Sequence, residues 1–254
     1  MSVPKIIHYC WFGGNPLPKS AKKCIQTWKK YCPDYEIILW NEENFDLSCN
    51  EYCRTMFAEK RWAFISDYAR LKVVYERGGI YLDTDVELVR SLDDLLNDSG
   101  YMGFQQAADI EVATGLGFAA EAGHPFIREN MEYYERLNTP VQSQACPHIT
   151  TELLKAHGLC DNDGSIQKVG GLTIYPPEYL CPKDERSGLL HKTKNTYSIH
   201  HYDASWFEES WKESKRKRLR QAKIDYILHT PNRALMALLG QERYDKLKKT
   251  LKRH

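Results

Sequence analysis

The chain has 254 residues, of which 42% are hydrophobic and 27% charged, a composition that is typical of a folded globular protein and excludes a disordered one. No stretch approaches the roughly 20 apolar residues of a membrane-spanning helix, and the first residues lack the apolar region of a signal peptide. The formal net charge is only +1, but residues 211–254 hold 14 Lys or Arg against 4 Asp or Glu, so one end is strongly basic and the body acidic.

Apolar runs alternate with helical patterns in the first half of the chain. The patterns predict strands at 5–12, 35–40 and 80–82 and helices over 20–31 and 54–77. Gly78 and Gly79 end the second helix as a C-terminal cap would. This alternation predicts an α/β sheet with helices on both faces, and ligands of such sheets bind beyond the carboxyl ends of the strands.

The second half is more mixed. A glycine-punctuated segment at 112–118 precedes a predicted helix over 125–137, a surface loop with three prolines at 175–184 and a last strand at 197–202. Beyond residue 211 the chain is basic and helical in pattern. We therefore expect an α/β domain over 1–206 and a basic helical extension over 207–254.

Eight cysteines raise the question of zinc or disulfides. Cys49 and Cys53 have three residues between them, but no second matched pair follows. Reduced thiols in a cytoplasmic protein are the simpler expectation.

The Asp83-Thr84-Asp85 sequence directly follows a Gly-Gly-apolar strand. Two carboxylates at this spacing can both serve a hard cation such as Mn²⁺ or Mg²⁺ if the chain bends there. Such a cation can bridge a diphosphate and stabilise the charge of a leaving nucleotide. Two solvated acids in a turn are the alternative.

The helix before this motif carries Ser66, Asp67 and Arg70. Asp67 and Arg70 are three residues apart and so lie on one helical face. They form either a common surface ion pair or a site in which Asp67 accepts from sugar hydroxyls while Arg70 contacts sugar or phosphate oxygens.

Both ends of the predicted α/β domain add candidate residues. Trp11, Phe12 and Gly13 end the first strand, where an aromatic ring and a glycine suit the stacking of a base, although both rings could equally be core. His200 and His201 lie on the last strand, where adjacent residues face opposite sides. One of them could therefore supply an imidazole ligand to a cation.

These residues together resemble the DXD-containing sugar-binding-region glycosyltransferases of family 32. That family includes bacterial capsular and lipopolysaccharide transferases and the yeast initiating mannosyltransferase, and it is related to the clostridial glucosylating toxins. The matching text covers about residues 3–206: Pro4 to His8, Trp11 to Gly14, Ser66 and Asp67 with Arg70, Gly78 to Asp85, Ile199 and His200, and Ser205 with Trp206.

The resemblance implies a GT-A fold, a Rossmann-like mixed sheet flanked by helices, and a retaining transfer of a hexose or N-acetylhexosamine. Trp11 would stack on the base, Asp67 and Arg70 would hold the sugar, and Tyr81 and Asp83 would approach the ribose and phosphates. The implied nucleotide-sugar contacts are Trp11, Phe12, Gly13, Ser66, Asp67, Arg70, Tyr81, Asp83, Thr84, Ser205 and Trp206. The implied catalytic set is Asp67, Arg70, Asp83 and Asp85.

The resemblance also implies the metal ligands. Asp85 would bind Mn²⁺ or Mg²⁺ directly beside Asp83, and a histidine would replace a glutamate of the toxins. We prefer His200 over His201 for that place. The Trp11 match favours a UDP-sugar donor.

Two other functions fit parts of the sequence. A phosphatase of the haloacid dehalogenase type also has Asp-x-Asp after a strand, but it needs Thr or Val where Glu87 stands. A non-catalytic module that binds sugar nucleotides or carbohydrate could keep Trp11 and Arg70, but has no need of a full set of metal ligands.

The short chain has no room for the toxins' helical insertions, which favours a glycan or lipid-linked acceptor in surface polysaccharide synthesis over a protein acceptor. The basic segment from Lys212 to Lys223 could contact anionic lipid on the inner face of the cell membrane. The alternatives are a solvated helix and, on charge alone, nucleic acid. We expect a cytoplasmic protein with no nucleic acid partner.

Overall fold

A computed structural model describes residues 2–105, 111–137, 145–203, 213–222 and 224. The chain divides into two compact units, one over Met1–Glu185 and Leu190–Trp206, the other over Arg186–Leu189 and Phe207–His254. In the second unit, residues 213–222 are helical, as the sequence predicted, and Lys217 pairs with Glu213 at 3.0 Å. The rest of the basic segment lies outside the described residues. Among the described helices, none is both long and apolar enough to cross a membrane.

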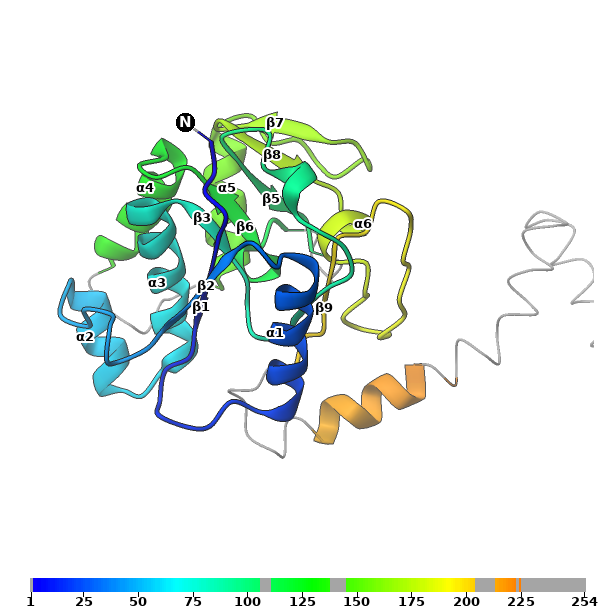
Figure 1. Ribbon diagram of the computed structural model, residues 1–254, viewed down its shortest axis with the longest axis horizontal. Coiled ribbons are helices and arrows are strands. Elements are labelled where there is room, and N and C mark those ends of the chain that lie inside the picture. Colours follow the sequence, from blue (N-terminus) through cyan, green and yellow to red (C-terminus); the bar gives the residue numbers. More distant parts are fainter. Residues whose placement is uncertain (1, 106–110, 138–144, 204–212, 223, 225–254) are drawn as a thin grey trace, which may run out of the picture. The chain divides into compact units, whose positions relative to one another are not determined.

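The first unit alternates strands and helices (Figure 1). In chain order its elements are β1 (Ile6–Cys10), α1 (Lys19–Tyr31), β2 (Glu36–Trp40), α2 (Glu51–Ala58), α3 (Trp62–Arg77), β3 (Gly79–Tyr81), β4 (Val86–Leu88), η1 (Asp93–Leu95), β5 (Gly100–Gly103), η2 (Thr114–Leu116), β6 (Phe118–Ala120), α4 (Pro125–Glu135), α5 (Cys146–Ala156), β7 (Gln167–Val169), β8 (Leu172–Tyr175), α6 (Pro177–Leu180) and β9 (Ser198–His200).

Seven strands form one mixed sheet in the order β2-β1-β3-β6-β5-β8-β7, and β4 pairs with β9 in a separate two-stranded sheet. β1 is parallel to β2 and β3, whereas β6 is antiparallel to both β3 and β5. The carboxyl ends of β1 and β3 therefore open at the same edge of the sheet. This confirms the predicted mixed α/β sheet and places Trp11 and Asp83 at one edge.

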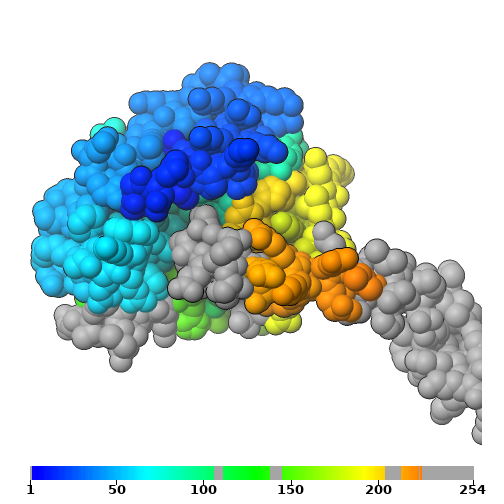
Figure 2. All heavy atoms as spheres, turned by 90° about the horizontal axis from the view of Figure 1, so that it is seen from below, coloured from blue at the N-terminus to red at the C-terminus, as the bar shows by residue number. Residues whose placement is uncertain are grey.

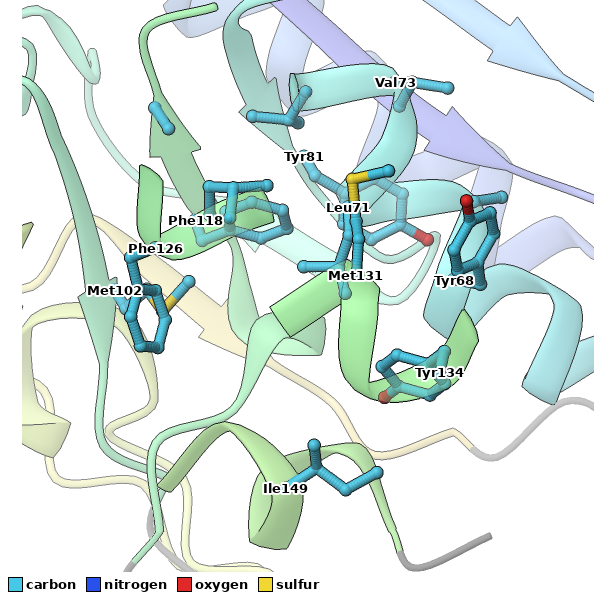
Figure 3. Close-up of a cluster of buried hydrophobic side chains, with 14 of the residues drawn as sticks. Tyr68, Leu71, Val73, Tyr81, Met102, Phe118, Phe126, Met131, Tyr134 and Ile149 are labelled. Atoms are coloured by element: carbon cyan, nitrogen blue, oxygen red, sulfur yellow. The ribbon is translucent and has the colours of Figure 1, made fainter. Parts of the chain in front are cut away.

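Helices bury hydrophobic side chains on both faces of the sheet. On one face α2, α3, α4 and α5 pack around a core that includes Leu71, Phe118 and Tyr134 (Figure 3). On the other face α1 and α6 pack through Trp28 and Leu180. Because both faces are covered, ligand access falls to the strand ends, where loops replace helices.

The structure differs from two predictions of secondary structure. The helix predicted over 54–77 is two helices, because Lys60 adopts a positive φ of 56° between α2 and α3 and so ends α2. The surface loop predicted at 175–184 contains the short helix α6, and Leu180 and Cys181 there are 1% and 0% exposed. Prolines at 176 and 177 start this helix, because proline fixes φ at a helical value without needing a donor partner.

His8 connects β1 to the corner that precedes β3. Its Nδ1 accepts from Trp40 Nε1 at 3.1 Å and its Nε2 donates to the Gly78 carbonyl oxygen at 2.9 Å, so the imidazole is neutral. Burial lowers the pKa of His8 to about 4. A Cβ on Gly79 would lie 2.7 Å from the Ile6 carbonyl oxygen, so only glycine allows β3 to lie this close to β1.

Candidate active site at the end of strand β3

A turn after β3 brings the two aspartates of the Asp-x-Asp motif to one side. The Val86 amide donates to the Asp83 carbonyl oxygen at 3.0 Å, which bends the chain across Asp83, Thr84 and Asp85. From the opposite side, Trp28 Nε1 donates to the Val86 carbonyl oxygen at 2.7 Å and ties the turn to α1. The bend that the sequence required for joint metal binding is therefore present.

β9 places His200 beside this turn. His200 pairs in register with Val86 of β4, and its Nε2 lies 3.3 Å from Asp85 Oδ1. Asp83, Asp85 and His200 each offer one ligand atom, and these atoms all lie within 4.8 Å of one another. Although burial opposes the charge, the Asp85 carboxylate raises the pKa of His200 to about 10, and His200 in turn lowers the pKa of Asp85.

Two carboxylate oxygens and one imidazole nitrogen form a donor set that suits Mn²⁺, and also Mg²⁺ if further oxygens come from a ligand or water. The residues at this site therefore fit a divalent cation. His201 lies elsewhere, because its Nε2 pairs with Glu87 Oε2 at 2.8 Å on the other side of the β4–β9 ladder. Of the two histidines, only His200 belongs to the described ligand cluster.

Arg70 of α3 joins the two acidic parts of the site. Its Nη2 lies 3.1 Å from Asp67 Oδ1 and 3.3 Å from Asp83 Oδ1, and its side chain is only 6% exposed. The Nε donates to the Ser66 carbonyl oxygen at 3.0 Å, and Nη1 donates to Thr114 Oγ1 at 3.3 Å. All three nitrogens are thus engaged, so in this structure the guanidinium holds protein carboxylates, and its contact with a donor stays a prediction.

Burial raises the pKa values of both carboxyl groups that Arg70 contacts. Burial, with a smaller contribution from Asp83, raises the pKa of Asp67 to about 6 against the attraction of Arg70. Burial and the neighbouring Asp85 also raise the pKa of Asp83. Carboxylates whose pKa values rise together in this way are more often found in functional sites than on ordinary surfaces.

Tyr81 and Gly115 form the floor beneath Asp83. Tyr81 donates its hydroxyl proton to Asp83 Oδ1 at 2.9 Å, and its ring packs against Phe118 in the core (Figure 3). A Cβ on Gly115 would overlap Asp83 Oδ2, so the backbone of η2 lies directly against this carboxylate.

Thr114, Gly115 and Cys146 also belong to the site, although the sequence did not predict them there. Cys146, at the start of α5, lies with its Sγ 3.7 Å from Arg70 Nη1 and 3.6 Å from Thr114 Oγ1. The three residues belong to no chemical motif of the sequence, and α5 is distant in sequence from α3. The glycine punctuation at 112–118 was the one available signal.

Of the two predicted aromatic residues at the end of β1, Phe12 is buried and Trp11 is partly exposed. Phe12 is 5% exposed and packs edge-on against Phe45 in the core, whereas Trp11 is half-buried. Gly13 has a positive φ of 96°, and a Cβ on it would lie 2.8 Å from Nε1 of the Trp62 indole. In Figure 2 the dark-blue N-terminal residues border cyan ones on the surface. The ring available to a ligand at this strand end is therefore that of Trp11.

The remaining predicted contacts lie around the same edge or outside the described residues. Ser66 is half-buried, and its hydroxyl donates to the Trp62 carbonyl oxygen at 3.1 Å. Thr84 is half-buried within the turn. Ser205 and Trp206 lie outside the described residues, so their predicted contacts with the phosphates stay predictions.

Comparison with known families bears on this geometry. Residues 18–101, which include α3, β3 and the Asp-x-Asp turn, match the family described as glycosyltransferase sugar-binding region containing DXD motif. This segment of the chain is therefore similar to the sugar-binding region of DXD-containing glycosyltransferases. The family 32 resemblance is thereby confirmed, and the mixed sheet with its DXD motif after β3 has the GT-A architecture that it implied.

Curated glycosyltransferases are similar to this chain over part of their length. Inositol phosphoceramide mannosyltransferase 3 of Schizosaccharomyces pombe is 32% identical over 134 residues, which cover 50% of this chain and 35% of that protein. Human alpha-1,4-N-acetylglucosaminyltransferase is 31% identical over 128 residues, which again cover 50% of this chain and 35% of the relative. The chain thus spans about a third of the length of these relatives.

Among solved structures, the PaToxG glycosyltransferase aligns with a TM-score of 0.49 and 21% identity. That alignment covers 61% of this chain and 69% of the other.

Proposed function

We propose that the protein is a metal-dependent glycosyltransferase that moves a hexose or N-acetylhexosamine from a nucleotide-sugar to a glycan or lipid-linked acceptor. The observation that carries this proposal is the convergence of Asp83, Asp85 and His200 beside the Asp67–Arg70 pair. Asp83 and Asp85 of this cluster lie in the DXD region that matches the family. A non-catalytic binding module would not need a complete set of metal ligands.

Asp83, Asp85 and His200 would hold Mn²⁺ or Mg²⁺. A cation there supplies positive charge that offsets the charge of a nucleoside diphosphate leaving group. The protein contributes the orientation of the ligands. Arg70 and Tyr81 both bind Asp83 Oδ1 and leave Asp83 Oδ2 to other partners. Asp85 is held through both oxygens, Oδ1 by His200 and Oδ2 by the Asp203 amide.

The other residues would bind the donor. Asp67 is 15% exposed and would accept hydrogen bonds from sugar hydroxyls, whereas Trp11 would stack on the base at the neighbouring strand end. The base is uracil in this proposal, on the strength of the Trp11 resemblance. Burial of the site raises the strength of each of these polar contacts relative to water.

The relatives' names support the class of acceptor and the stereochemistry. One relative is named for inositol phosphoceramide, a lipid, and another for an alpha-1,4 linkage. We accordingly propose a lipid-linked or glycan acceptor and a retaining transfer to an α-linked product. A role in surface polysaccharide synthesis is part of this proposal.

A cytoplasmic location with contact to anionic membrane through the basic segment is a separate proposal. Residues 213–222 form a helix that carries Lys215, Arg216, Lys217 and Arg218. Replacing these four residues with Gln should abolish sedimentation with vesicles that contain phosphatidylglycerol. Unchanged sedimentation would contradict the membrane proposal and leave the enzymatic one intact.

Donor hydrolysis tests the enzymatic proposal. The full chain is incubated with a panel of UDP- and GDP-sugars, with and without Mn²⁺, beside Asp85→Asn and the matched control Asp163→Asn. Asp163 is an exposed aspartate that caps a turn through Ser165. Slow metal-dependent cleavage of one donor by the wild type and the control, lost in Asp85→Asn, supports the proposal. Absence of both cleavage and metal-dependent donor binding by calorimetry would favour a non-catalytic binding module instead.

A further inference from the structure

Tyr202 has a backbone conformation that is unusual for its residue type. Its φ is +56°, in the left-handed region that a bulky side chain rarely adopts. Lys60, between α2 and α3, is the other non-glycine residue with positive φ in the described part of the chain. This conformation is unfavourable for any residue with a Cβ, because that atom crowds the following carbonyl oxygen. Backbone strain of this kind persists where the surrounding contacts impose it and is common near functional sites.

The turn at Tyr202 wraps the chain around Asp85. Just before it, the His201 amide donates to the Asp85 carbonyl oxygen at 3.0 Å and extends the β4–β9 ladder by one bond. Just after it, the Asp203 amide donates to Asp85 Oδ2 at 2.8 Å. With a right-handed or extended backbone at Tyr202, the following amide would point in another direction. The left-handed conformation is therefore what delivers the Asp203 amide to this carboxylate.

The side chain of Tyr202 packs on the other side of the same site. Its ring centroid lies 4.3 Å from that of the His200 imidazole, at an interplanar angle of 53°. Its hydroxyl oxygen lies 3.0 Å from Sγ of Cys181, a residue that is 0% exposed in the core. The ring is thus held at both ends, by the backbone turn and by the buried thiol.

His200 needs such support from packing. Its Nε2 pairs with Asp85, but its buried Nδ1 has no hydrogen bond of good geometry, and only the weakly polar Cys181 thiol interacts with the imidazole besides Asp85 among the described side-chain hydrogen-bond partners. In most metal sites the second ring nitrogen of a histidine ligand donates a hydrogen bond that fixes the plane of the ring. Here the Tyr202 ring occupies one face of the imidazole and can fix that plane by contact.

We propose that Tyr202 is a positioning residue of the metal site, which orients His200 with its ring and Asp85 with its left-handed backbone. This inference rests on the proposed function, because it requires that Asp83, Asp85 and His200 bind a divalent cation. It assigns a role to a residue that contributes no ligand atom to the described cluster.

Metal affinity measured without any donor tests the inference. The full chain and its variants are titrated with Mn²⁺, and free Mn²⁺ is followed by electron paramagnetic resonance. We expect Tyr202→Ala to bind Mn²⁺ about tenfold more weakly, as is usual when a group that supports a metal ligand is lost. Tyr202→Phe, which keeps the ring, should bind within about threefold of the wild type. The Mn²⁺ affinity of Tyr202→Gly should lie between those of Tyr202→Phe and Tyr202→Ala. Glycine adopts a positive φ without strain and so keeps the Asp203 amide in place, but it lacks the ring.

Lys60→Ala is the matched control, since Lys60 has the same φ of 56° and lies in the turn between α2 and α3. It should leave Mn²⁺ affinity unchanged. A second readout needs no metal: the amide proton of Asp203 should exchange with solvent faster in Tyr202→Ala than in the wild type or in Tyr202→Phe.

Each outcome decides the question. Wild-type affinity in Tyr202→Ala would overturn the positioning role while leaving the metal site intact. An equal loss in Lys60→Ala would show general destabilisation and would also overturn it. A wild type that binds no Mn²⁺ would overturn both this inference and the proposed metal dependence.

Discussion

Arg70 and Asp83 form an ion pair of 3.3 Å between α3 and the turn after β3, and the same guanidinium nitrogen also lies 3.1 Å from Asp67. One buried cation therefore stands between two carboxyl groups. Burying such charges is costly, so this contact fixes geometry more than it adds stability. This cost is consistent with a site in which the positions of the charged groups matter for ligand binding.

Replacing Arg70 should destabilise the fold. Arg70→Ala leaves Asp67 and Asp83 buried without their shared cation, and breaking a buried pair in this way costs about 3–5 kcal/mol. Arg128→Ala is the control, because Arg128 is 40% exposed and pairs with Glu132 and Glu135 at the surface. It should cost less than about 1 kcal/mol. Urea unfolding measures both, and equal losses would contradict a special role for Arg70.

The two adjacent histidines should differ in metal affinity. His200→Ala removes a nitrogen of the ligand cluster and should weaken Mn²⁺ binding by at least about tenfold. His201→Ala removes only the pair with Glu87, while the backbone bond from residue 201 to Asp85 is retained. It should bind Mn²⁺ as the wild type does. The reverse order, measured by calorimetry, would assign the ligand to His201.

Acid should destabilise the protein through His8. Its pKa is about 4 in the folded chain, lowered by burial from an unfolded value near 6.5. Between these values the unfolded chain binds more protons, so the free energy of unfolding falls as pH falls from 6.5 to 4. At about 1.4 kcal/mol per unit the loss approaches about 3 kcal/mol.

The comparison with His8→Gln isolates this effect from the titration of carboxyl groups. The variant lacks the titrating group, so its stability should change less than that of the wild type between pH 6.5 and 4. Urea unfolding at several pH values in this window measures the difference. Parallel pH curves for the two proteins would show that His8 does not stay neutral when folded.

Gly115 should tolerate no side chain without damage to the metal site. A Cβ there would overlap Asp83 Oδ2 and lie 3.3 Å from Arg70 Nη1. Gly115→Ala should therefore displace Asp83 and weaken Mn²⁺ binding by about tenfold. Gly103→Ala is the control for crowding alone, since its Cβ would meet Leu180 Cδ1 at 2.8 Å in the core. If both variants bind Mn²⁺ equally well, η2 does not position Asp83.

The sequence by itself determined the elements whose signals are local. Gly78 and Gly79 before an apolar run predicted β3 and the Asp-x-Asp turn, and the spacing of Asp67 and Arg70 predicted their shared face. These predictions succeeded because hydrophobic period, glycine conformation and helical spacing act between neighbours in the chain. The prediction of a single helix over 54–77 was wrong at Lys60, because a left-handed residue other than glycine leaves no sequence signal.

Only the tertiary structure decided which distant residues complete the site. The register of β9 against β4 places His200 toward Asp85 and His201 toward Glu87, and a shift of one residue would exchange them. Phe12, which the sequence could not distinguish from Trp11, lies in the core because the packing around β1 turns it inward. Strand register and side-chain packing depend on the whole fold, so these choices could not be derived from local sequence.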